Sequence, residues 1–252
     1  MSDGIYAALS GAVAQERALE VVANNVANVG TAGFRADRLT FAESLSRASA
    51  GADGSPVPAS LHYVVVDRER MDPTAGPLRE TGNALDLALG GDDAYFAVRT
   101  ERGERYTRDG SFSVAPDGVV RTRGGDAVLA DAPPGAVPEV LRVPPGTTTI
   151  SVGPDGTLSA GDAALGRVRI VRFSADSLRH EGASLLVASA GAVAAPAPDA
   201  VVTSGWLEGA NVSPIHGMNE LVAVTRSFEA FQRVIQGFRD LDSRTARELA
   251  GS

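Results

Sequence analysis

The residues best suited to bind a metal ion are few and scattered in this sequence. The three histidines, His62, His180 and His216, lie far apart, and none has a second histidine at the spacing of a helical metal site. Cysteine is absent, so thiolate nucleophiles, disulfides and cysteine-type zinc sites are excluded. The sequence therefore predicts no metal site and no cofactor.

The adjacent acids Asp92 and Asp93 are the remaining candidates for acid–base chemistry. Neighbouring residues of a strand point to opposite faces, and Gly90 and Gly91 before them indicate a turn. The glycine patterns of nucleophile elbows, dinucleotide sites and phosphate loops do not occur in the chain. We therefore predict a protein that is not an enzyme and has no catalytic, cofactor-binding or metal-binding residues.

The composition is that of a folded protein with an acidic surface. The chain has 252 residues, of which 44% are hydrophobic and 21% charged, so a disordered chain is excluded. Acidic residues outnumber basic ones by 31 to 23 without a cluster of positive charge, which argues against nucleic acid as a partner. Asp3 occupies the region where a cleaved secretory signal carries positive charge, and prolines interrupt the apolar segment 185–202. We expect neither a cleaved signal nor membrane insertion.

Because the sequence offers so few reactive side chains, its secondary-structure elements are more informative about function. The first of these elements is an N-terminal helix. Proline is absent from residue 2 to about residue 28, and apolar residues recur at alternating intervals of four and three. Glu16 interrupts this stripe and alanines fill two of its positions, so the face is weak and requires a partner. Its large members are Ile5, Leu9, Leu19 and Val26.

A second proline-free segment, residues 215–249, predicts a long C-terminal helix with a stronger apolar seam. Ser213 and Pro214 suit the N-cap and the first turn. The seam keeps unbroken intervals of three and four, as in a coiled coil. It consists of Leu221, Val224, Phe228, Phe231, Ile235 and Phe238.

Between the helices, the sequence predicts an all-β domain. Turn signals at 109–110, 116–118 and 154–156 separate short runs of β-forming residues that predict strands, such as residues 94–100. Segments 46–60 and 192–199 are rich in alanine, glycine, serine or proline and read as linkers. The fold class is therefore mixed α and β, with terminal helices paired as a coiled coil. We expect a discontinuous helical assembly domain (1–41 and 205–252), a linker or extended segment (42–60) and a central β-domain (61–204).

Two motifs are more specific than these patterns. Residues 23–28 read ANNVAN and residues 31–35 read TAGFR, where asparagine and glycine suit a helix end and a turn. Residues 205–212, GWLEGANV, directly precede the long helix. The motif residues are Asn24, Asn25, Asn28, Thr31, Gly33 and Phe34 in the first and Leu207, Glu208, Asn211 and Val212 in the second.

Both motifs resemble those of the bacterial flagellar rod and hook axial protein family. The segments TGNALDLAL at 81–89 and RYTRDGSF at 105–112 are similar to family stretches as well. The resemblance implies a structural subunit of the basal-body rod that polymerises through its terminal helices into a helical tube, transmitting torque and surrounding the export channel. Its implied partners are copies of itself, other rod subunits and the type III export apparatus. Its implied location is the periplasmic part of the basal body, reached without a cleaved signal.

The length and the opening GIYAALSG at 4–11 favour a proximal-rod over a distal-rod subunit of this family. The distal-rod subunit stays open as an alternative. A second alternative, from another class, is a secreted β-rich enzyme or glycan-binding module. It would require polar groups that converge on the β-domain, and the sequence shows only scattered ones.

Overall fold

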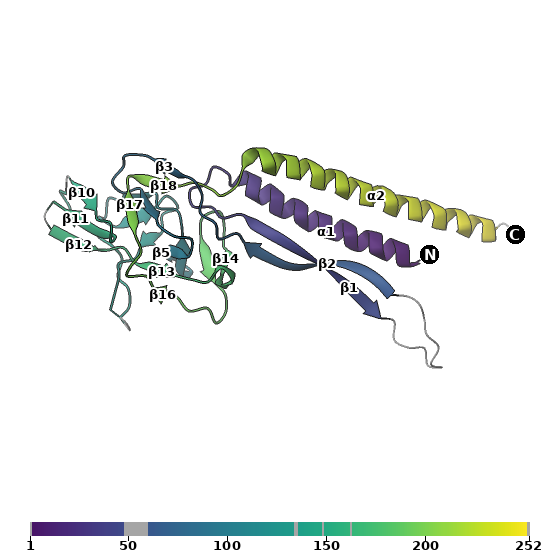
Figure 1. Ribbon diagram of the computed structural model, residues 1–252, viewed down its shortest axis with the longest axis horizontal. Coiled ribbons are helices and arrows are strands. Elements are labelled where there is room, and N and C mark those ends of the chain that lie inside the picture. Colours follow the sequence, from purple (N-terminus) through teal and green to yellow (C-terminus); the bar gives the residue numbers. More distant parts are fainter. Residues whose placement is uncertain (1, 48–59, 134–135, 148, 162, 251–252) are drawn as a thin grey trace. The chain divides into compact units, whose positions relative to one another are not determined.

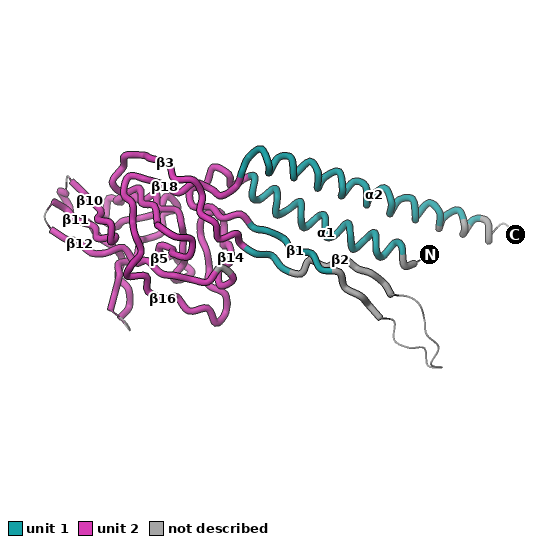
Figure 2. The backbone as a smooth tube through the Cα atoms, in the orientation of Figure 1, with its two compact units in different colours: residues 1–26, 37–70, 213–252 teal, residues 27–36, 71–212 magenta. Residues whose placement is uncertain are grey.

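The computed structural model describes residues 2–47, 60–133, 136–147, 149–161 and 163–250. The chain forms two compact units, each built from discontinuous segments (Figures 1 and 2). Unit 1 comprises Met1–Val26, Asp37–Arg70 and Ser213–Ser252, and unit 2 comprises Ala27–Ala36 and Met71–Val212. The division differs from the expected one, because residues 27–36 and 205–212 belong to the β-rich unit and residues 61–70 to the helical unit.

Unit 1 contains the two terminal helices. Helix α1 spans Ser2–Ala27 and helix α2 spans Pro214–Ala250. Pro214 is the first helical residue, and the Ser213 hydroxyl accepts a long hydrogen bond, 3.5 Å, from the N–H of His216, as expected of an N-cap. Two terminal helices around a β-rich segment confirm the predicted fold class at this level, whereas a supercoiled helix pair stays a prediction.

Unit 1 also contains a hairpin of two strands, β1 (Asp37–Arg47) and β2 (Ser60–Met71). The expected linker 42–60 therefore overlaps the end of β1, and residues 48–59 lie outside the described part of the chain. An isolated hairpin is marginally stable. This one is joined to α1, because Arg17 pairs with Glu69 at 2.6 Å and the Asn25 side chain exchanges two hydrogen bonds with the backbone of Asp37.

Unit 2 is built from short antiparallel strands. Its largest sheet has the order β14-β15-β6-β5-β9-β8-β7, with β13 pairing both β5 and β16, and smaller sheets are β10-β11-β12, β4-β17 and β3-β18. The strands are β3 (Leu78–Glu80), β4 (Leu87–Leu89), β5 (Ala94–Thr100), β6 (Gly103–Thr107), β7 (Phe112–Val114), β8 (Val120–Thr122), β9 (Ala127–Val128), β10 (Ile150–Val152), β11 (Thr157–Ala160), β12 (Ala163–Arg167), β13 (Ile170–Arg172), β14 (Leu178–His180), β15 (Leu186–Ala188), β16 (Ala195–Pro196), β17 (Val202–Ser204) and β18 (Trp206–Glu208). A short 3₁₀ helix, Ala175–Ser177, precedes β14.

Strand β5 is the centre of unit 2. Its residues alternate between two hydrophobic clusters, with Phe96 and Val98 in one and Tyr95 and Ala97 in the other. Side chains of a strand point to opposite faces in turn, so a strand that is buried throughout must lie between two cores. This explains why the run 94–100, predicted as a strand, reads as almost continuously apolar.

The expected second linker, 192–199, is wrong. Ala195–Pro196 forms β16 on the edge of β13, and Ala197 is only 3% exposed in the core. A run of alanine and proline reads as flexible in sequence. Here the small side chain of Ala197 fits a tight core, and proline is tolerated on a short edge strand.

The burial of Tyr106 predicts that unit 2 loses stability at alkaline pH. It is 8% exposed and packs edge-on against Phe173, with ring centroids 4.5 Å apart. Burial, followed by the negative charge of Glu104, raises the pKa of Tyr106 to about 12 from its ordinary value of 10.0. The folded state therefore holds this proton more tightly than the unfolded state, so the contribution to stability is complete below pH 10 and falls as the pH rises towards about 12.

Urea unfolding across this pH range, followed by fluorescence of the single tryptophan, Trp206, should show that fall. The variant Tyr106→Phe should show a shallower one. Equal slopes in both proteins would contradict the assignment.

Candidate assembly site

The structure places the predicted seam of α2 along its less exposed face. From Met218 to Leu241 every position is exposed except Thr225 and the seam itself. Each seam residue is half-buried: Leu221, Val224, Phe228, Phe231, Ile235 and Phe238. Partial burial in the isolated chain means that some apolar surface on this face still lacks a partner.

On α1, the packed face differs from the predicted stripe. Ile5, Leu19 and Val26 are half-buried, but Leu9 is 50% exposed. The buried side chains of the helix are instead mostly small ones: Ala8, Ala12, Ala14, Val21 and Val22. The coiled-coil and assembly role of the four stripe residues therefore stays a prediction, and Leu9 is not covered within the isolated chain.

The two helices meet where glycines of α1 face phenylalanines of α2. A Cβ added at Gly11 would lie 2.5 Å from Cε1 of Phe231, and one added at Gly4 would lie 2.9 Å from Cζ of Phe238. Since the α1 numbers rise as the α2 numbers fall, the helices are antiparallel, as the ends of the chain in Figure 1 show. Extended by one heptad, this register predicts that Ala18 lies opposite Val224.

The chain leaves α1 and approaches α2 through two segments of unit 2, which we call root 1 (residues 28–36) and root 2 (residues 205–212). The first motif shapes root 1. The N–H and hydroxyl of Thr31 donate to the carbonyl and side-chain oxygens of Asn28, at 3.0 and 3.3 Å, and close the turn after the helix. Asn24 is exposed on α1. Gly33 has φ +67°, a conformation suited to glycine.

The second motif binds root 2 to root 1. The N–H of Gly33 donates to the carbonyl of Glu208 at 2.8 Å, and the N–H of Asn211 donates to the carbonyl of Phe34 at 3.2 Å. The Asn211 side chain accepts the N–H of Ala36 at 2.7 Å. Leu207 is buried, and Val212 is half-buried. The two motifs, far apart in sequence, are therefore one hydrogen-bonded structure.

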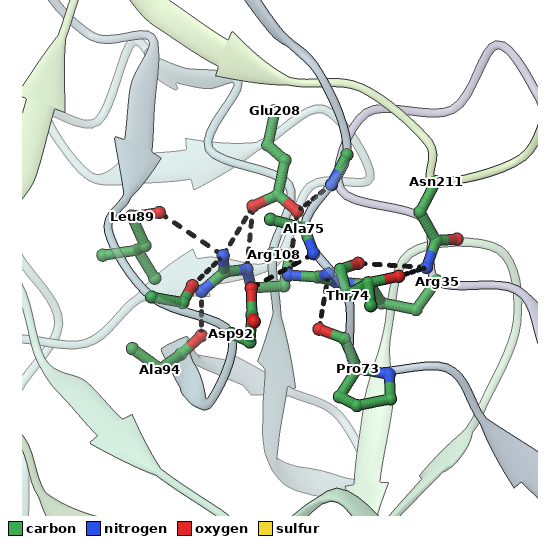
Figure 3. Close-up of polar contacts among 12 residues, drawn as sticks. Arg35, Pro73, Thr74, Ala75, Leu89, Asp92, Ala94, Arg108, Glu208 and Asn211 are labelled. Atoms are coloured by element: carbon green, nitrogen blue, oxygen red, sulfur yellow. Dashed lines mark hydrogen bonds and ion pairs between the residues drawn. The ribbon is translucent and has the colours of Figure 1, made fainter.

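At the centre of this structure, one carboxylate lies between two guanidinium groups (Figure 3). Glu208 Oε1 is 2.8 Å from Nη2 of Arg35, and Oε2 is 2.7 Å from Nη2 and 2.9 Å from Nε of Arg108. The N–H of Gly76 also donates to Oε1 at 3.0 Å. The three charged side chains are at most 1% exposed. We call Arg35, Arg108 and Glu208 the buried triad.

The buried triad contains two positive charges and one negative charge, and backbone carbonyl groups compensate the excess positive charge. Arg108 donates to the carbonyls of Ala94, Leu89 and Gly91 at 2.6, 3.3 and 2.7 Å. Arg35 donates to the carbonyl of Pro73 at 2.7 Å. Burial lowers the pKa of Arg35, against the opposing charge of Glu208. Removing one member of such a buried group leaves an uncompensated charge, so the triad holds together or fails as a unit.

Sequence reasoning missed three residues of this region. Arg35 and Arg108 appear in the motif segments but were not assigned a role, and His180 was considered only as a metal ligand. Phe34, only 1% exposed, stacks on the His180 ring at 5.2 Å, and His180 Nε2 lies 2.9 Å from the carbonyl oxygen of Arg35. The sequence did contain a signal for the triad: two of the motif segments each contain an arginine, and a third contains a glutamate that could pair with them.

The acidic side chains that are candidates for acid–base catalysis make structural contacts. An open cavity of about 660 Å³ in unit 2 includes Asp92, Asp93 and Arg172 in its lining. Asp93 pairs with Arg172 at 3.4 Å, and Asp92 accepts the N–H of Ala75 at 3.1 Å. In the described part of the chain no group of three acidic or histidine side chains could hold a metal ion. Neither helix, as far as it is described, has an apolar run that would cross a bilayer.

Comparison with family models places this chain among the axial proteins of the bacterial flagellum. "Flagella basal body rod protein" matches residues 5–35. "Flagellar hook protein FlgE/F/G D1 domain" matches residues 89–160. "Flagellar basal body rod FlgEFG protein C-terminal" matches residues 203–248.

The chain belongs to the flagellar basal-body rod protein family, and within it is most like FlgF. It is 31% identical to FlgF of Caulobacter vibrioides over 252 residues, covering all of this chain and 99% of the relative. It is 32% identical to FlgF of Escherichia coli, with both chains covered completely. FlgG of Bacillus subtilis is 30% identical over 93% of this chain and 94% of its own length, so the distal-rod alternative is less favoured.

The contact between Gly11 and Phe231 predicts an unusual effect of alanine. In an ordinary helix interior, glycine to alanine stabilises by about 0.5–1 kcal/mol. At Gly11 the added Cβ would displace the ring, and overpacking costs about 1–3 kcal/mol. We expect Gly11→Ala to lower the thermal midpoint of the helical circular dichroism signal.

The matched control is Gly237→Ala in α2, where nothing lies within 4 Å of the added Cβ. This change should raise the midpoint. An equal gain for both variants would show that Gly11 is not in contact with α2.

Because the triad is buried, removing the charge of Glu208 without changing its shape should strongly destabilise unit 2. Glu208→Gln keeps the shape of the side chain but leaves two buried cations without a carboxylate, and we expect a loss of about 3–5 kcal/mol in the free energy of unfolding of unit 2. Trp206, two residues away on β18, reports this unfolding in urea.

Asp199→Asn is the control, because Asp199 pairs with Arg172 at 2.8 Å on the surface of the same unit. It should leave the urea midpoint nearly unchanged. A similar shift of the urea midpoint in both variants would mean that the buried triad stabilises unit 2 no more than a surface ion pair does.

Proposed function

We propose that this chain is a structural subunit of the flagellar rod at its proximal position, and that α1 and α2 are the elements through which it polymerises. In this proposal the helices form the assembly part and the β-rich unit faces outwards, limiting how subunits tilt against one another. The role is mechanical, so no catalytic residue and no cofactor is assigned. Membership of the rod family and the greater likeness to FlgF support it.

The observation that carries this proposal is apolar surface left open on both helices. On α1, Tyr6, Leu9 and Val13 are 54%, 50% and 56% exposed, and their spacing puts them on one face. On α2, Val234 and Leu241 are 48% and 53% exposed, one heptad apart. Apolar faces of this kind mark an interaction surface, and neighbouring subunits are the partners that a rod supplies.

The charge distribution also favours assembly through the two terminal helices. Residues 1–41 hold four acids and three bases, and residues 205–252 hold six and five, so each end is close to neutral. Near-neutral helices can pack against copies of themselves with little repulsion, while the middle of the chain carries most of the net charge of −8. We propose that antiparallel α1 and α2 form a two-stranded coiled coil and that neighbouring coiled coils build the tube.

The remaining parts of the proposal concern location and partners. The subunit would assemble with copies of itself and with other rod subunits in the periplasmic part of the basal body, around the export channel. It would reach that position through the type III export apparatus without a cleaved signal. The lack of cysteine is compatible with such a compartment.

Phe231→Asp tests the assembly role. A carboxylate in the middle of the seam must be desolvated at any helix contact, which is unfavourable. We expect a strain that carries only this variant to lose swarming motility, while Trp206 fluorescence shows that unit 2 stays folded.

Gln232→Asp introduces the same side chain at the neighbouring, exposed position of α2 and should leave motility intact. Wild-type swarming of Phe231→Asp would refute the assembly role of the seam.

A further inference from the structure

Both helix roots meet at one residue of the β-rich unit, Arg108. A Cβ added at Gly33 of root 1 would lie 2.3 Å from the carbonyl carbon of Arg108 and 2.4 Å from the nitrogen of Asp109. The guanidinium of Arg108 binds Glu208 of root 2 through Nε and Nη2. Root 1 therefore rests on the backbone of Arg108, and root 2 is held by its side chain.

The core of unit 2, not the roots, determines where Arg108 lies. Arg108 directly follows β6, which pairs with the central strand β5. Its guanidinium donates to three carbonyls of residues 89–94 and lies 5.8 Å from the centroid of the Tyr95 ring. A planar fork with this many partners has a single orientation.

The roots have little freedom to shift on this anchor. At Gly33, with φ +67° and backbone atoms so near, no side chain fits. Glu208 cannot move away without leaving Arg35 and Arg108 buried and unpaired. The separation of the two roots is therefore set to within the tolerance of a charged hydrogen bond.

That separation passes to the helices through the chain itself. Root 1 follows directly on Ala27, the last residue of α1, and root 2 ends one residue before Ser213, which caps α2. The contacts of Gly4 and Gly11 with the α2 rings leave no room for a Cβ, so a small shift at the end of α1 or the start of α2 would move the rings out of register. We propose that Arg108, acting through Glu208 and through its own backbone, is a positioning residue that sets the register of the helix pair for assembly.

This inference rests on the proposed function, and a change of side-chain length tests it. Glu208→Asp keeps the charge but shortens the reach by one methylene, so root 2 must move to keep its partners. Arg108→Lys keeps the charge and loses the fork. Val128→Ala is the control, because Val128 is fully buried in β9 and belongs to neither root. It weakens the core of unit 2 without touching the anchor.

Two readouts separate positioning from stability. Because the chain has no cysteine, Ala18→Cys with Val224→Cys introduces a single pair of thiols, which we expect to form a disulfide only when the helices keep this register. Cross-linking in cells and swarming are measured for each variant, and Trp206 fluorescence reports the folding of unit 2. We expect Glu208→Asp and Arg108→Lys to lose the cross-link and swarming with unit 2 folded, and Val128→Ala to keep both.

Normal cross-linking and swarming of Glu208→Asp would overturn the positioning role. So would cross-linking and swarming that follow the stability of unit 2 in every variant, Val128→Ala included. If Glu208→Asp and Arg108→Lys both unfold unit 2, the anchor serves only the fold, and the proposal is again overturned. Failure of the proposed function appears separately, as swarming of Phe231→Asp, whatever the behaviour of the anchor variants.

Discussion

A single buried carboxylate, that of Glu208, is shared by the guanidinium groups of Arg35 and Arg108, and the packing of both helix roots on the core of unit 2 depends on that sharing. The three residues come from three distant parts of the chain and are all but inaccessible to solvent. Isolated charges at such depth would be strongly unfavourable, so none of the three can be buried without the others. Backbone carbonyls around Arg108 balance the excess positive charge. The shared carboxylate therefore binds root 2 to both root 1 and Arg108 at the same time.

The helix pair follows a different principle, complementarity of size. Glycines of α1 receive the phenylalanine rings of α2, as large and small residues interdigitate in any dense core. Two helices alone cannot cover each other, which is why the α2 seam is only half-buried and Tyr6, Leu9 and Val13 are exposed. A subunit that leaves such faces open is suited to a structure in which neighbours cover them.

These two principles explain why the motifs of the rod family lie where they do. Asn28, Gly33 and Phe34 form the turn that leads out of α1, and Glu208 and Asn211 bind that turn to the segment leading into α2. They bind the segment that follows α1 to the segment that precedes α2, and bind both segments to the core of unit 2.

The sequence alone was sufficient for features that depend on local periodicity and turn chemistry. Both helices, the seam from Leu221 to Phe238 and strand 94–100 could be predicted because spacing and turn residues act over a few positions. The tertiary structure decided what depends on distant partners. Gly11 rather than Leu9 faces α2, because a phenylalanine ring fits against a glycine, and Ala197 lies in a core rather than a linker. The tertiary structure also paired Arg35 and Arg108 with Glu208, since the electrostatic requirement for a shared counter-charge exists only once folding has removed all three from water.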